Sequence, residues 1–221
     1  MGFDWHPNTN DMWFTDNGRD DIGANSSYDT NNTPDDELNW VPTATPGLNY
    51  GYPWCHSLGY GDPYERDLLT VTAIADPDLG SGNTSNCSSE QIVLAYQPLG
   101  PHVAALNVKF YTHSMFPSEY MNAMFIAQRG SWDRTPLIGY RVMVIKMQQQ
   151  RKSESDKFVS YSTFAEGWLN NGTQTYWGRP SGIAWLPDGS MLLSDDYSST
   201  IYRIYYVEKE KEQEEEEGFV V

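Results

Sequence analysis

The chain has 221 residues, enough for one domain with a sizeable core, and carries a formal net charge of −16. This acidic balance argues against nucleic acid or an anionic membrane as the principal partner. The sequence holds no apolar run of the ~18 residues that a spanning helix needs, and Met1 is not followed by the regions of a signal peptide. Glycine and proline recur along the whole chain, which predicts an all-β protein of many short strands joined by turns.

The first informative stretch lies near the N-terminus. A short apolar run at residues 12–15 predicts a strand, and the Asp-Asn-Gly that follows it predicts a turn. The polar loop after this strand is crowded with carboxylates, namely Asp16, Asp20, Asp21, Asp35, Asp36 and Glu37. Such crowding is electrostatically costly, and oxygen ligands of this kind favour a hard cation such as Ca²⁺. The alternative is an acidic turn stabilised by solvent alone.

A weak internal repeat then organises the chain. A proline-led turn followed by a short strand recurs around Met12, Met124 and Met191, and two copies continue into a second strand, at residues 139–144 and 201–206. In the last of these, side chains alternate with period 2, as expected of a half-buried strand. Repeated short antiparallel strands suggest the blades of a β-propeller. With blades of roughly 40 to 50 residues, we expect the long gap after Met12 to hold two units and the chain about four.

The two cysteines, Cys55 and Cys87, lie in turn-rich segments. A disulfide between them would close a loop of about 30 residues and contribute roughly 3 kcal/mol; two reduced thiols are the alternative. Together with five Asn-x-Ser/Thr sequons, this pair favours an extracellular or periplasmic location and a glycoprotein. The sequons begin at Asn25, Asn31, Asn83, Asn86 and Asn171.

The remaining segments complete the expected layout. Residues 106–111 predict a strand that follows His102, and residues 148–156 predict an exposed linker. We expect the propeller portion to span residues 1–207. The Lys/Glu-rich residues 208–221 are expected to form a disordered acidic tail.

Several motifs together resemble the glucose/sorbosone dehydrogenase family of pyrroloquinoline quinone (PQQ) enzymes. They cover nearly the whole chain and are specific as a set: WFTDNGRD at 13–20, PDDELN at 34–39, GPHVAAL at 100–106, GSWDR at 130–134, GRP at 178–180 and SDDY at 194–197. The resemblance implies a six-bladed β-propeller, of which this chain covers about the C-terminal half to two-thirds. It also implies a quinoprotein dehydrogenase that oxidises a sugar or related alcohol or aldehyde and passes electrons to an acceptor.

The resemblance also implies roles for individual residues, with PQQ and Ca²⁺ as cofactors. Calcium would be held by the backbone carbonyls of Gly18 and Arg19, and a structural calcium by Glu37, Tyr50 and Asp62. Contacts to PQQ would come from Arg179, Arg129, His102 and Asn17, because arginine offers a fixed fork of donors to a carboxylate. A general base takes the substrate hydroxyl proton in this chemistry. The resemblance assigns no residue of this chain to that role, and His102 is the histidine that could substitute for it.

The family's general base lies in its N-terminal half, for which this chain has no counterpart, so we expect the catalytic site here to be incomplete. A second hypothesis is a non-catalytic propeller that binds a carbohydrate or a protein partner through the same loops.

Overall fold

The computed structural model describes residues 1–23, 29–45, 47–59, 71–79, 87–88, 90–147, 160–208 and 218–220. As predicted, the fold is all-β and of propeller type, with three four-stranded antiparallel sheets among these residues. The first sheet has the order β1-β2-β3-β6 and contains Phe3–Trp5, Met12–Asp16, Asp35–Val41 and Gln97–Pro101. The second has the order β10-β9-β8-β7 and contains Ser160–Ala165, Arg141–Lys146, Met124–Gln128 and Ala105–Phe110. The third has the order β13-β14-β15-β16 and contains Pro180–Trp185, Met191–Asp195, Thr200–Val207 and Gly218–Val220.

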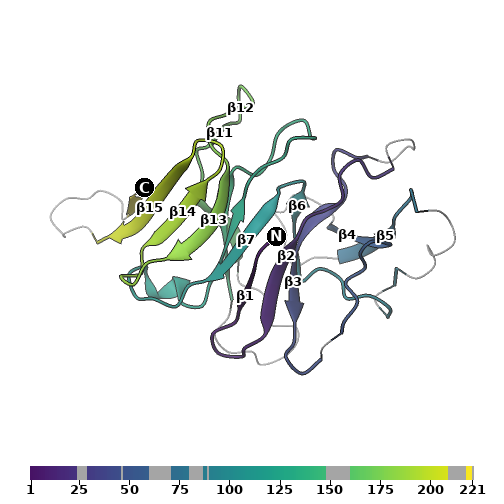
Figure 1. The fold of residues 1–221 in the computed structure, drawn as a ribbon, viewed down its shortest axis with the longest axis horizontal. Helices are drawn as coiled ribbons and strands as arrows, with labels where there is room; N and C mark the ends of the chain where they lie inside the picture. Colours follow the sequence, from purple (N-terminus) through teal and green to yellow (C-terminus); the bar gives the residue numbers. More distant parts are fainter. Residues whose placement is uncertain are drawn as a thin grey trace.

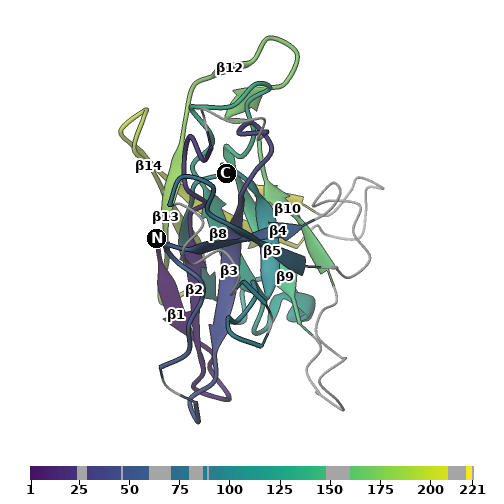
Figure 2. The same ribbon diagram turned by 90° about the vertical axis from the view of Figure 1, so that its right-hand side faces the viewer.

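The three sheets stand side by side, with β7 between the first and the third (Figure 1). Two hairpins accompany them: β4 (Cys55–Gly59) with β5 (Val71–Ala75), and β11 (Leu169–Asn170) with β12 (Thr175–Tyr176). A short 3₁₀ helix, η2, covers Ser118–Tyr120. Viewed from the side, β4 and β5 cross the direction of the neighbouring strands (Figure 2). No helix among the residues that the structure describes is long and apolar enough to cross a membrane.

The expectation of about four units is wrong for the described chain. The gap between the first two repeat starts does not contain two complete units, because the fourth strand of the first sheet, β6, is separated from β3 by a long insertion that carries the β4–β5 hairpin. Residues 218–221 were also expected to be part of a disordered tail, but residues 218–220 form β16, which pairs with the end of β15. The expected linker at 148–156 and the sequons at Asn25, Asn83 and Asn86 lie outside the described residues.

Within the described part of the chain, the hydrophobic core has two layers, one on each face of the middle sheet. Strand β8 shows why: Met124 and Ile126 pack toward the first sheet, whereas Phe125 and Ala127 pack toward the third. All five of its residues are buried. Alternating side chains of a strand point to opposite faces, so a strand covered on both sides must be apolar at every position that meets a core.

The third sheet shows the predicted alternation. Tyr202, Ile204 and Tyr206 of β15 pack into the core that this sheet shares with the middle sheet. Tyr205 and Val207 point the other way and are exposed. Period 2 in the sequence therefore identified the strand.

The predicted disulfide between Cys55 and Cys87 is present, and it joins β4 to a segment 32 residues further along the chain. Closing a loop of this length restricts the unfolded chain, which is worth about 3–4 kcal/mol on the chain-entropy model. We expect the Cys55→Ala/Cys87→Ala double variant to lose about this amount of unfolding free energy, measured by urea denaturation without reductant. Adding reductant to the unsubstituted, disulfide-bonded protein should lower its unfolding free energy as well. A loss below about 1 kcal/mol in both experiments would show that the bridge does not limit the stability of this fold.

One predicted sequon has a structural role that competes with modification. The Asn31 side chain donates to Thr135 O at 2.6 Å and accepts from Thr135 N at 2.7 Å, which ties the 29–45 segment to the loop after β8. A glycan on this amide nitrogen would disrupt the pair. Asn171, by contrast, is exposed in the β11–β12 turn.

Candidate active-site pocket

The loops at one end of the sheets converge on a common region. This end is formed where β2, β6, β8 and β14 finish and where β3, β7 and β13 begin. The turn between β6 and β7 is unusual, because His102 and Ala104 both have positive φ, 59° and 53°. Such backbone angles are uncommon for residues with a side chain and cluster at binding sites.

A chain of hydrogen bonds orders these loops from the first sheet to the middle one. Asp36 begins this chain, since its carboxylate accepts from Gly18 N at 2.9 Å and from Ala105 N at 3.0 Å. Beside Ala105, the Ala104 carbonyl accepts from Arg129 N at 2.9 Å. Asp36 is 1% exposed, and burial raises its pKa to about 7 although both N–H groups favour the charged form.

The chain of hydrogen bonds continues to the third sheet through Arg179. Its Nε donates to Arg129 O at 3.3 Å, and one terminal nitrogen donates to the carbonyls of Gly130 and Ser131. The guanidinium also lies over the rings of Tyr140 and Tyr176, 5.4 and 5.5 Å from their centroids. Arg179 is 7% exposed, and among the described residues it forms no ion pair with a carboxylate. Gly18 and Arg179 therefore belong to the same end of the molecule, as the resemblance required.

Glycines permit the close packing of this region. Gly130 has φ +99°, and a Cβ on it would lie 2.4 Å from the Tyr140 ring. Gly139 has φ +89°, and a Cβ there would meet Gly130 Cα at 2.7 Å. A side chain at either position would push the loop away from Arg179, so the tight turn depends on glycine.

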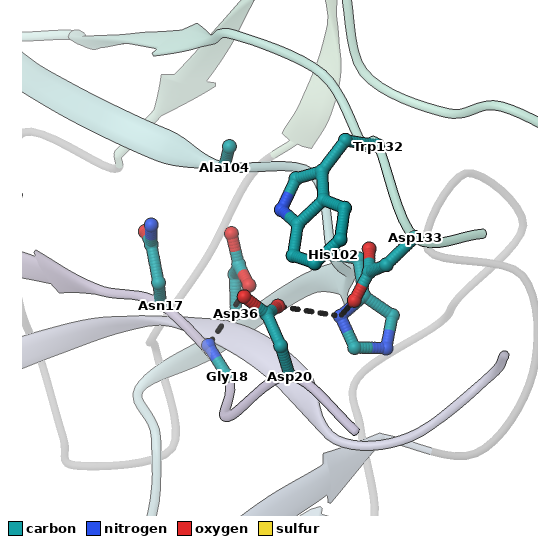
Figure 3. A pocket seen from close by; sticks show the side chains of 8 residues that line it. All are labelled: Asn17, Gly18, Asp20, Asp36, His102, Ala104, Trp132 and Asp133. Carbon is teal, nitrogen blue, oxygen red and sulfur yellow. Dashed lines mark hydrogen bonds and ion pairs between the residues drawn. The ribbon is translucent and has the colours of Figure 1, made fainter. Parts of the chain in front are cut away.

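A small pocket of about 70 Å³ opens in front of these loops, and Figure 3 shows the side chains around it. It is lined by Asn17, Gly18, Asp20, Asp36, His102, Ala104, Trp132 and Asp133. Asn17, Gly18 and His102, which the resemblance implied as cofactor or metal residues, are among them, and so are Asp20 and Asp36 of the predicted acidic stretch. Asp133 was missed as a site residue, since no local spacing in the sequence connects it to the acidic stretch at residues 16–37.

His102 is buried at the back of this pocket. Its Nε2–H donates to Thr30 O at 2.8 Å, and its Nδ1 lies 3.5 Å from Asp20 Oδ1 and 3.4 Å from Asp133 Oδ2 (Figure 3). Burial, followed by the charge of Asp133, raises the pKa of Asp20. Both ring nitrogens of His102 thus face protein groups.

The other predicted residues have partners of their own. Arg129 Nε donates to Asp196 Oδ2 at 2.7 Å, and the Arg19 side chain turns away from the pocket to pair with Asp76 and Asp78. Burial alone would raise the pKa of Asp76, but hydrogen bonds from Arg19 and His56 outweigh it and lower the pKa to about 2. This network anchors the Asn-Gly-Arg turn to the segment after β5.

The predicted structural calcium residues lie on the other side of β3 from Asp36. The Glu37 carboxylate accepts from Asn39 Nδ2 at 2.9 Å and from Ser57 N at 3.1 Å, and burial raises its pKa, with a smaller contribution from Asp16. The Tyr50 hydroxyl donates to Trp40 O at 2.7 Å. Asp62, the third predicted ligand, lies outside the described residues.

The Asp195 carboxylate accepts a hydrogen bond from the backbone of Arg179. The contribution of its charge to stability should be visible in the pH dependence of the unfolding free energy. Its Oδ1 accepts from the backbone N–H groups of Arg179, Tyr197 and Ser198, each at 2.9 Å. Burial alone would raise the pKa of Asp195, but these hydrogen bonds outweigh burial and lower it. A carboxylate whose pKa is lowered in the native state stabilises the fold at pH values above its pKa in the unfolded chain, which is about 4. This stabilisation is lost as the pH falls toward and through the lowered pKa of the native state.

We therefore expect Asp195→Asn to reduce the unfolding free energy by about 1.5–3 kcal/mol at pH 7. The difference from the unsubstituted protein should shrink as the pH falls below about 4, measured by urea denaturation at a series of pH values. Asp196→Asn, at the exposed neighbour, is the control and should change stability by about 1 kcal/mol or less. A difference that is constant from pH 7 to pH 3 would contradict the role given to the Asp195 charge.

Comparisons with known proteins agree with this fold and this arrangement of loops. The structure of a Trichoderma reesei enzyme of carbohydrate-active enzyme family AA12, solved with iodide, superposes with a TM-score of 0.71 at 23% identity, over 90% of this chain and 50% of that one. The holo PQQ domain of pyranose dehydrogenase from Coprinopsis cinerea gives a TM-score of 0.66 at 19% identity, over 90% and 52% of the two chains. The fold is thus that of the propeller domains of PQQ dehydrogenases.

The sequence comparison identifies the family. The TrAA12-like family model matches residues 1–207, so the chain belongs to the TrAA12-like family. An uncharacterized protein from Borreliella burgdorferi is 32% identical over 206 residues, which are 93% of this chain and 46% of that protein. The PQQ-dependent pyranose dehydrogenase of Coprinopsis cinerea is 24% identical over 195 residues, or 82% of this chain and 26% of that enzyme. The chain therefore spans less than half the length of the curated relatives it matches.

Proposed function

We propose that this chain forms the cofactor-binding end of a quinoprotein dehydrogenase that uses PQQ and Ca²⁺ to oxidise a sugar or a related alcohol or aldehyde. The observation that carries the proposal is the continuous set of hydrogen bonds from Gly18 through Asp36 and Arg129 to Arg179. It holds the loops of three sheets in one arrangement beside a pocket. Membership of the TrAA12-like family supports the same assignment.

Arg179 fits a carboxylate of PQQ. Its charge is buried and faces backbone carbonyls and aromatic rings, without an ion pair among the described residues. A buried cation of this kind is stabilised further by a carboxylate that approaches its remaining donors, and the planar guanidinium suits that geometry. Arg129 and Asn17 would add contacts at the rim, with Arg129 exchanging part of its pairing with Asp196.

The loop at Gly18 fits a calcium ion held by backbone oxygens. The Arg19 side chain is drawn to Asp76 and Asp78, so the Asn-Gly-Arg turn is fixed without side chains blocking the pocket. When bound, PQQ with its Ca²⁺ would supply the electron-accepting quinone, polarised by the cation. The residues of this chain would bind and orient the group and exclude water from it.

The Glu37 region fits a second, structural cation. Asp16 and Glu37 are paired in register on β2 and β3, and each carboxylate has a pKa raised chiefly by burial. A buried acid beside a half-buried one is costly unless a cation lies between or beside them. Calcium held by Glu37 and Tyr50, with Asp62, would offset this cost.

If this structural calcium is present, a chelator should lower the melting temperature, because an ion that binds the native state stabilises it by mass action. Glu37→Gln should abolish the sensitivity to the chelator, while Glu119→Gln, an exposed control in η2, should retain it. The measurement is a thermal melt with and without excess chelator. Equal melting temperatures under both conditions in the unsubstituted protein would remove calcium from this site.

A second candidate function has one observation in its favour. The His102 ring directs both nitrogens at protein atoms, Thr30 O on one side and two carboxylates on the other. This geometry is poorly suited to taking a proton from a substrate hydroxyl. A propeller that binds a carbohydrate without turnover would need no such base.

Incubation with PQQ and Ca²⁺ separates the two candidates. A quinoprotein should bind PQQ with an affinity that depends on Ca²⁺, and the holo protein should reduce an artificial dye when given an aldose or a related alcohol. A carbohydrate-binding propeller should bind a sugar while failing to bind PQQ. The absence of PQQ binding in the presence of Ca²⁺ would end the dehydrogenase proposal. For its location, we propose an extracellular or periplasmic protein, in keeping with the Cys55–Cys87 bridge.

A further inference from the structure

Three side chains, two carboxylates and an imidazole, converge at the back of the pocket, where a cation would be stabilised. His102 comes from the β6–β7 turn, Asp20 from the loop after β2, and Asp133 from the loop after β8. One ligand atom from each lies within 4.8 Å of the other two. In Figure 3 the two carboxylates lie on the same side of the imidazole ring, facing the same nitrogen.

The hydrogen bond on the far side of the ring fixes the state of His102. A backbone carbonyl can only accept, so Nε2 must carry the hydrogen that it donates to Thr30 O. In the neutral imidazole, Nδ1 then presents a lone pair toward Asp20 and Asp133. A histidine whose other nitrogen donates to a backbone carbonyl is the usual arrangement of a metal ligand.

The same atoms lack other partners. Nδ1 of His102 and Oδ1 of Asp133 are buried and have no hydrogen-bond partner among the described residues. The two side chains are 1% and 7% exposed, whereas Asp20 is 48% exposed and forms the open side of the cluster. Buried polar atoms of native proteins are nearly always satisfied, so an unpartnered nitrogen aimed at two carboxylates points to a ligand between them.

The distances suit a metal ion better than direct hydrogen bonds. Separations of 3.4 and 3.5 Å between Nδ1 and the carboxylate oxygens are long for hydrogen bonds. Ligand atoms about 2.1 Å from one ion in tetrahedral geometry lie about 3.4 Å apart. One imidazole nitrogen with two carboxylate oxygens is a donor set for a borderline ion, since magnesium and calcium prefer oxygen alone.

We infer that Asp20, His102 and Asp133 bind a divalent transition-metal ion of the Zn²⁺ or Mn²⁺ class, at a site distinct from the backbone carbonyls expected to hold calcium. The ion would have three protein ligands and an open position toward the pocket, on the side of Asp20. Arg134 and Trp132 flank Asp133 in sequence, and the Asn31–Thr135 pair holds this loop against the first sheet. The site does not depend on PQQ, so it is tested without the quinone.

The test is titration calorimetry of the untagged, chelator-treated chain with Zn²⁺, Mn²⁺, Ca²⁺ and Mg²⁺ in separate experiments. We expect one equivalent of Zn²⁺ or Mn²⁺ to bind at least about 10-fold more tightly than Ca²⁺ or Mg²⁺. Asp133→Asn should weaken this binding by about 100-fold or more, since even the loss of an outer partner of a ligand costs 10–100-fold. Asp196→Asn makes the same charge change at the same end of the molecule and should leave the affinity unchanged.

Two further measurements keep the test decisive if Asp133→Asn fails to fold. Asp20→Asn alters the half-exposed ligand, which the fold tolerates more easily, and it should weaken binding in the same direction. X-ray absorption of the zinc-loaded protein should give a first shell with one imidazole nitrogen among oxygen ligands. Unchanged affinity in Asp20→Asn would overturn the inference. A preference for Ca²⁺ over Zn²⁺ and Mn²⁺ would also overturn it, and so would the failure of the chelator-treated protein to bind any of the four ions at pH 7.5.

Discussion

Replacing Phe125 with alanine is expected to lower the unfolding free energy by about 3–5 kcal/mol, as for other large-to-small changes in a packed core. The Phe125 ring is fully buried, and its centroid lies 4.8 Å from that of Phe164 and 5.2 Å from that of Trp185. These two partners come from the second and third sheets. The cavity left by the variant would therefore loosen the contact between sheets as well as remove apolar burial.

Urea denaturation of Phe125→Ala at pH 7 measures this loss. Phe3→Ala is the matched control, because Phe3 in β1 is 58% exposed and its truncation should cost about 0.5 kcal/mol or less. Phe125→Leu should recover part of the loss by filling some of the cavity. A change of under about 1 kcal/mol for Phe125→Ala would mean that the second and third sheets do not pack as described.

Replacing Arg179 is expected to have the largest effect on cofactor binding. Arg179→Lys keeps the positive charge but removes the planar fork, so we expect the affinity for PQQ in the presence of Ca²⁺ to fall about 10- to 100-fold. This corresponds to about 1.4–2.8 kcal/mol. Arg179→Gln removes the charge as well and should weaken binding further. Binding can be followed by titration of the chain with PQQ in calcium-containing buffer.

The control for Arg179 is Arg203, which pairs with Asp188 at the opposite end of β14. Arg203→Gln should leave PQQ affinity unchanged. Because Arg179 also binds three backbone carbonyls, its variants need a melting curve beside each binding curve. If Arg179→Lys is folded and binds PQQ as tightly as the unsubstituted protein, the role of Arg179 is limited to holding the loop at residues 129–131 in place.

Local patterns in the sequence were sufficient to predict several of the strands. The runs around residues 12–15, 106–111 and 201–206 correspond to β2, β7 and β15, because apolar periodicity and turn residues act over a few neighbours. The cysteine pair was predicted from its setting in turns, although Cys55 is in fact buried on β4. The number of sheets was not predicted correctly, since repeat spacing cannot distinguish a further blade from a hairpin inserted between two strands of one blade.

The site was predictable in part. The resemblance placed Gly18 and Arg179 at one end, and the structure agrees, whereas the cofactor and metal roles of the individual residues stay predictions. The cluster of Asp20, His102 and Asp133 could not have been predicted from spacing, because its members come from three loops that are far apart in sequence. The carboxylates that the sequence analysis placed in one loop point in different directions, because Asp35, Asp36 and Glu37 belong to β3. Asp36 faces the pocket, while Glu37 faces β4 through Ser57.

The placement of β8, with one apolar layer on each side, has a consequence for how the chain comes apart. Opening either layer exposes buried side chains of this one strand, Met124 and Ile126 on one face or Phe125 and Ala127 on the other. The amide protons of β8 should therefore exchange with deuterated solvent last, at the rate of complete denaturation, and those of β7 and β9 close behind. The amide protons of the outer strands β1 and β16 should exchange earlier. The pattern would then be graded outward from one slowly exchanging strand, rather than showing a separate slow core in each sheet.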